Sequence, residues 1–85
     1  LICQDKENAI ETRMQNREDH LKYVVETNVV KYAGPFLSED DTMIGSLIVI
    51  DVENKNEAKK WSENDPYKKA GLFGKVEIFK FKHLI

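Results

Sequence analysis

The stretch from Ser46 to Val52, "SLIVIDV", constrains the fold of this chain most. It is short, β-branched and free of Gly and Pro, which predicts a β-strand. Apolar residues occupy odd and even positions alike, so both faces of this strand require cover. The last predicted strand, "KVEIFKFK" (residues 75–82), also carries apolar side chains on both faces. The chain must therefore bury both faces of at least part of its sheet.

A long segment without Gly or Pro, residues 7–28, predicts the first helix. Apolar side chains recur along it at spacings of three and four, as they do on one face of an amphipathic helix. We expect this stripe to face the core. Its members are Ile10, Met14, Leu21, Val24 and Val25.

Two further strands are predicted. The opening "LICQ" has the unalternating apolar pattern of the end of a buried strand. Residues 29–36, "VVKYAGPF", form a strand whose Gly34 and Pro35 indicate a sheet edge, a bulge or a strand end. Residues 37–45 are expected to form the connecting loop.

A second helix is expected to begin at Asn54. Asn is a good N-cap, and Glu57 three residues later can satisfy backbone amides reciprocally. Pro66 disfavours the helical conformation at Asp65, so the helix should end near Asn64.

The predicted order is strand, helix, strand, strand, helix, strand. This is the ferredoxin-like βαββαβ pattern of the α+β class, in which two helices cover one face of an antiparallel sheet. We expect one domain over residues 1–85, with residues missing before Leu1 and the first strand cut short. The helices leave one sheet face bare, and the simplest cover is the same face of a second copy, which predicts a homodimer.

The composition limits the classes of partner and cofactor that we expect for this chain. The chain has 13 basic and 15 acidic residues and a net charge of −2, which offers no electrostatic footprint for nucleic acid. No apolar run approaches the roughly 20 residues of a membrane-spanning helix. The lone Cys3 permits no internal disulfide, which suits a reducing, cytoplasmic setting. Neither a glycine-rich phosphate loop nor a cluster of metal ligands is present, so we expect no cofactor and no metal.

Charged side chains lie unusually close to the predicted core stripe of the first helix. Arg17 falls inside the stripe, and Arg13 and His20 fall at its edge. These three follow a four, three spacing that makes them neighbours on a helix surface. They are candidates for an anion-binding and proton-transfer site. The alternative is that each Arg buries its stem and pairs with a nearby acid.

Asp65 allows two interpretations. An Asp directly before Pro suits the start of a helical turn, because its oxygen can accept backbone amides while Pro occupies the first helical position. A carboxylate pinned in that way is also a suitable partner for an imidazole such as that of His20. The two roles are compatible.

Four segments carry a family resemblance: "REDHLKYV", "AGPF", "IGSLIVID" and "NDPYKKAGLF". In this order and spacing they resemble the YCII-related (YciI-like) family. The resemblance implies a dimeric α/β-barrel of ferredoxin-like subunits, related in fold to muconolactone isomerase. It also implies an active-site dyad of a histidine and an aspartate, which match His20 and Asp65.

Two functions follow as hypotheses. The first is a cofactor-free isomerase or lyase that transfers a proton through His20 and Asp65 on a small carboxylated substrate. Arg17, and with it Arg13, would hold the carboxylate, and Ser46 could add a hydroxyl contact, although a polar residue at a strand end needs no function. The second is a dimeric module that binds a small ligand or a partner without turnover. The aromatic residues Trp61, Tyr67 and Phe73 and the apolar Cys3 are expected to pack in the core, and His83 is expected to have no catalytic role.

Overall fold

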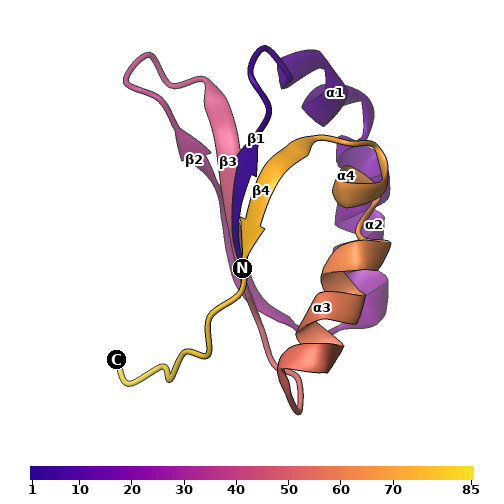
Figure 1. Ribbon diagram of the computed structural model, residues 1–85, viewed down its shortest axis with the longest axis vertical. Coiled ribbons are helices and arrows are strands. Elements are labelled where there is room, and N and C mark those ends of the chain that lie inside the picture. Colours follow the sequence, from indigo (N-terminus) through magenta and orange to yellow (C-terminus); the bar gives the residue numbers. More distant parts are fainter.

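A single antiparallel sheet with strand order β2-β3-β1-β4 organises the chain, and its helices lie on one face (Figure 1). The computed structural model describes all residues, 1–85. The elements are β1 (Ile2–Asp5), α1 (Ile10–Gln15), α2 (Arg17–Thr27), β2 (Val30–Leu37), β3 (Met43–Ile50), α3 (Lys55–Asn64), α4 (Pro66–Lys69) and β4 (Phe73–Glu77). This is the predicted ferredoxin-like α+β fold.

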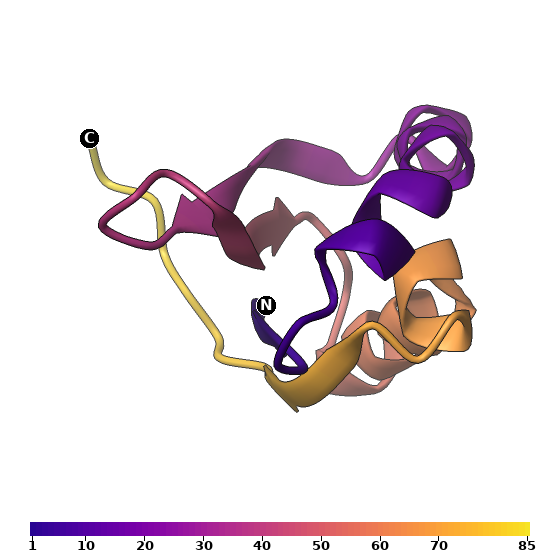
Figure 2. The same ribbon diagram turned by 90° about the horizontal axis from the view of Figure 1, so that it is seen from above.

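The sheet register divides the strand residues between two faces. Cys3 lies opposite Ser46 and Val76, and all three share the face that the helices cover. On the opposite face Phe36 lies over Gly45, and Tyr32 is paired with Val49. Tyr32 and Phe36 are exposed there, at 45% and 38%. Seen from above, α1 to α4 lie together on one side (Figure 2), so the chain leaves the second face without helical cover.

The predicted first helix is interrupted. It divides into α1 and α2 at Asn16, whose backbone has φ −109° and ψ 5°. The Asn16 side chain donates to the carbonyl of Thr12 at 2.8 Å, and its backbone amide also donates there. Asn competes for backbone hydrogen bonds in this way, which explains why a segment without Gly or Pro still breaks.

The predicted core stripe of that helix is wrong. Four of its five apolar residues are exposed: Ile10, Met14, Leu21 and Val25. The buried residues are Arg13 and His20, at 3% and 7% exposure. Arg13 and His20 lie on the same helical phase on the two sides of the break at Asn16. The inner face of both helices is therefore the polar row beside the apolar stripe, and it carries a polar cluster.

The β2–β3 hairpin and the end of the last strand differ most from prediction. The β2–β3 hairpin is longer than expected, because pairing begins at Met43 opposite Leu37 and leaves only residues 38–42 as the loop. The last strand ends at Glu77 instead of Lys82, since β4 pairs only with β1 and that pairing ends where Ile2 lies opposite Glu77. Residues 78–85 continue without regular structure.

The second helix begins and ends as predicted. The Asn54 side chain caps α3 by accepting the Glu57 amide at 3.0 Å. The Glu57 carboxylate accepts the Glu53 amide, one residue earlier than expected. α3 ends at Asn64, and Asp65 then caps the short α4.

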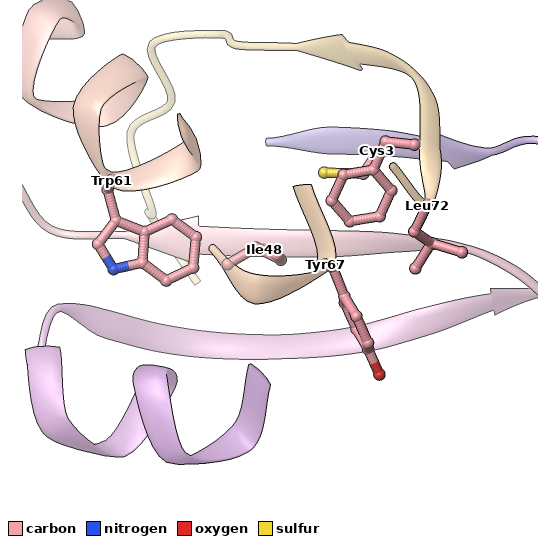
Figure 3. Packing of buried hydrophobic residues seen from close by; sticks show 6 residues of the cluster. Cys3, Ile48, Trp61, Tyr67 and Leu72 are labelled. Atoms are coloured by element: carbon pink, nitrogen blue, oxygen red, sulfur yellow. The ribbon is translucent and has the colours of Figure 1, made fainter. Parts of the chain in front are cut away.

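The hydrophobic core lies between the sheet and the short helices. It comprises Cys3, Ile48, Trp61, Tyr67, Leu72 and Phe73 (Figure 3). The expected packing roles of the three aromatic residues and of Cys3 are confirmed. None of the helices has the length and apolar character that crossing a membrane requires.

Candidate active site

His20 and Asp65 meet in the interior. The Nδ1 atom of His20, from α2, lies 2.7 Å from Oδ1 of Asp65, at the junction of α3 and α4. Asp65 is 1% exposed. The predicted contact is therefore confirmed. Because the carboxylate accepts, Nδ1 carries the proton, and the lone pair of the neutral ring lies on Nε2.

Asp65 is fixed by the local sequence. Its backbone is extended, with φ −64° and ψ 126°, as the following Pro66 favours. The same Oδ1 that contacts His20 also accepts the backbone amide of Tyr67 at 2.9 Å. Asp65 is thus a helix cap and a histidine partner at once, as the two compatible interpretations required.

Tyr67 is a site residue whose place the sequence did not indicate. Its ring stacks on the His20 ring, with centroids 4.0 Å apart and planes inclined by 11°. Its hydroxyl points away from the core residues Cys3, Ile48 and Leu72 (Figure 3). Burial raises the pKa of Tyr67, against the opposing charges of Arg13 and Arg17, so its hydroxyl stays protonated at neutral pH. The sequence signal for Tyr67 as a site residue was its position two residues after Asp65.

Arg13 is held by two polar partners. Its Nε and Nη2 donate to the two carboxylate oxygens of Asp5, both at 2.8 Å, and Nη2 also donates to Ser46 Oγ at 2.9 Å. Burial alone would lower the pKa of Arg13, but the hydrogen bond and charge of Asp5 outweigh it and raise that pKa. The alternative in which Arg13 pairs with an acid is thus realised. Asp5 lies eight residues before Arg13, and only the fold shows that they meet.

Arg17 differs from its prediction. It lies on the surface instead of inside a core stripe, and it forms no salt bridge within the chain. Its charge opposes the rise that burial causes in the pKa of the Tyr67 hydroxyl. Arg17 is consequently a cation beside the Tyr67 end of the site that remains available to an anion.

An open groove of about 940 Å³ runs beside this cluster. It lies between the loop of the β2–β3 hairpin and the connection from β1 to α1. The pairing of β1 with β3 ends nearby, where Gln4 lies opposite Gly45. Cys3 and Asp5 contribute to its wall, together with apolar residues such as Phe36 and Ile44. His20 and Asp65 do not line it, so the groove meets the cluster through Asp5. No three His, Cys, Asp or Glu side chains converge as metal ligands.

A family model described as the YCII-related domain matches residues 1–82. The chain belongs to the YCII-related family. Within this family it is 34% identical to a protein of Haemophilus influenzae, over 96% of this chain and 93% of the relative. It is 28% identical to protein YciI of Escherichia coli, with the same coverage.

One solved structure connects the YCII-related fold to chemistry. It is TftG, a 5-chloro-2-hydroxyhydroquinone dehydrochlorinase from Burkholderia phenoliruptrix, in complex with 2,5-dihydroxybenzoquinone. This chain is similar to it with a TM-score of 0.86 and 30% identity, over 96% of this chain and 90% of the other. The YCII-related family thus contains an enzyme of lyase type.

Proposed function

We propose that this chain is a cofactor-free lyase or isomerase in which His20 is the base and Asp65 its partner. The observation that carries the proposal is the buried hydrogen bond of 2.7 Å between the two side chains. Buried carboxylate and imidazole pairs are the usual device for holding a base in one tautomer. The similarity to a dehydrochlorinase supports this class of reaction.

In the proposed mechanism Nε2 of His20 takes a proton from the bound molecule. Asp65 holds the ring through Nδ1 and stabilises the imidazolium that forms. In a lyase reaction a leaving group such as chloride then departs with the electron pair. In an isomerase reaction the imidazolium returns the proton to another carbon or oxygen. Neither reaction consumes an oxidant, a reductant or a cofactor.

The proposed ligand is a small anion, and Arg17 is its counter-ion. Arg17 is exposed and free of salt bridges, as a side chain that binds an incoming anion should be. A carboxylate would suit it. A hydroxyquinone would also suit it, because a hydroxyl conjugated to a quinone carbonyl is acidic and ionises like a carboxylic acid. We assign no substrate contact to Ser46, since its hydroxyl already accepts from Arg13.

We also propose that two copies pair through the sheet face that the helices leave bare. Exposed Tyr32 and Phe36 on that face, beside the half-buried Leu47 and Val49, supply an apolar surface that a second sheet would bury. Mass in solution at micromolar concentration should be twice the chain mass. A folded monomer at that concentration would contradict the pairing.

The experiment for the enzymatic proposal measures chloride release from 5-chloro-2-hydroxyhydroquinone, with a panel of small ring-derived carboxylic acids followed by NMR in parallel. H20Q and D65N are compared with wild type, and K22Q, an exposed position on the same helix, is the matched control. We expect turnover with at least one compound, lost in H20Q and lowered in D65N. Turnover that persists in H20Q would contradict the role of His20.

The low exposure of the His20 side chain, 9%, favours a second candidate, a ligand-binding module without turnover. In that case the dyad serves to order the fold. Saturable binding of a small anion that R17Q abolishes, with no reaction of any compound in the panel, would favour this module over the enzyme.

A further inference from the structure

A series of side-chain contacts leads from Asp5 through Arg13 and Tyr67 to the imidazole of His20. We propose that Asp5, Arg13 and Tyr67 are a positioning array that fixes the plane of the His20 ring, and that Arg13 is a positioning residue and not a contact for the substrate. The inference deepens the proposed function and rests on it for its catalytic consequence. Its structural part can be tested without any turnover.

The array begins with an immobilised guanidinium. Arg13 comes from α1, Asp5 from β1 and Ser46 from β3, so three elements meet at one group. Three hydrogen bonds of 2.8 to 2.9 Å hold it, two of them as a bidentate pair to Asp5. Arg13 is 3% exposed. A planar fork bound in this way has a fixed orientation. Its burial leaves a ligand little access to the N–H groups of Nη1 that these bonds do not use.

The guanidinium in turn contacts the Tyr67 ring. Cζ of Arg13 lies 4.9 Å from the ring centroid, within the range of a cation–π contact. Phe73 meets the same ring edge-on, with centroids 6.0 Å apart and planes at 81°. The backbone of Tyr67 is tied to Asp65 through its amide. Tyr67 is therefore constrained through its backbone and through its ring.

Tyr67 restricts a rotation of the His20 ring that Asp65 alone would permit. A single hydrogen bond to Nδ1 fixes one ring atom of His20 but lets the ring turn about that bond. A second ring stacked at 4.0 Å and 11° opposes this rotation. Together the two contacts set the direction in which Nε2 points. Proton transfer depends steeply on that direction, because a base must lie in line with the proton it takes.

The test uses the NMR signals of the His20 ring protons, which the stacked Tyr67 ring shifts through its ring current. R13K keeps the charge but removes the bidentate fork, and Y67F and Y67L respectively keep and remove the aromatic ring. We expect the ring-current shift to persist in Y67F, to vanish in Y67L and to shrink in R13K. The matched control K22Q removes an exposed cation from α2, whose partner is Glu26, and should leave the shift unchanged.

A reduced shift in folded R13K would support the array, and an unchanged shift would overturn it, since Arg13 would then only stabilise the fold. If R13K does not fold, D5N gives the same test, because it removes the charge that orients the guanidinium. With a substrate available, R13K should lower kcat by about tenfold to a hundredfold and change KM less. Full activity in H20Q would refute the proposed function, yet it would leave the NMR result standing.

Discussion

Replacing Asp65 with Ala should remove its two structural roles together, because one oxygen serves both. Oδ1 accepts the His20 Nδ1 proton at 2.7 Å and the Tyr67 amide at 2.9 Å, in a residue that is 1% exposed. D65A removes this acceptor and so breaks both hydrogen bonds. Loss of the cap costs about 1 kcal/mol, and a buried His20 donor without a partner costs about 1 to 3 kcal/mol. We expect D65A to lower the free energy of unfolding by about 2 to 4 kcal/mol in total.

D65N should cost much less. The amide oxygen of Asn still accepts both protons, so only the difference between a charged and a neutral acceptor is lost, about 1 kcal/mol. The order of stability is therefore wild type, then D65N, then D65A.

Urea unfolding followed by circular dichroism measures these differences, with protein concentration held constant because a dimer's stability depends on it. The matched control is D51A, since Asp51 is exposed and only meets Lys31 at 3.7 Å; its midpoint should not change measurably. Equal losses in D65N and D65A would refute the reasoning, because the shared acceptor would then not be the source of the stability.

Three further perturbations test other contacts. G45A should lower the urea midpoint and destabilise the protein by about 1 to 3 kcal/mol, because the added Cβ would clash with the Cys3 carbonyl oxygen. Y23F should cost about 0.5 to 1.5 kcal/mol in the same assay, because it deletes the hydroxyl that donates to the Trp61 carbonyl at 2.7 Å. Burial raises the pKa of Cys3 from 9.0 to about 12. The unfolded thiol thus ionises above about pH 9 while the folded one does not, and the free energy of unfolding should fall with rising pH by at most about 1.4 kcal/mol per pH unit. C3A should lose that part of the slope, and an identical slope in C3A and wild type would contradict it.

Local signals made most of the fold predictable. The β-branched run of β3, the Gly and Pro of β2 and the Asn54 cap of α3 each determine structure within a few residues. Their order along the chain then permits few topologies. The start of α4 at Asp65 and Pro66 is also a local signal, because its cap depends only on adjacent residues.

The errors arose where tertiary contacts override a pattern. Nothing in the periodicity of residues 7–28 shows that Asn16 bonds back to Thr12 and interrupts the helix. Met14 and Leu21 are exposed because the polar row that carries Arg13 and His20 faces inward in place of the apolar stripe.

The site was predictable in part. The family resemblance paired His20 with Asp65, and the structure shows them in contact. Asp5 could not be paired with Arg13 from sequence, because only the turn after β1 brings them together. Tyr67 was expected in the core and is there, but its stacking on His20 depends on the angle between α2 and α4, which no short-range pattern encodes.

The central claim is that His20 presents an unprotonated Nε2 to a bound anion while Asp65 holds Nδ1. A spectrum that correlates the ring nitrogens of His20 with its ring protons tests this directly, with and without saturating 2,5-dihydroxybenzoquinone. We predict that the neutral form of the ring carries its proton on Nδ1 in the free protein, and that the Nε2 signal changes saturably when the compound binds. A neutral ring with its proton on Nε2 in the free protein, or saturation of binding without any change at Nε2, would contradict the claim.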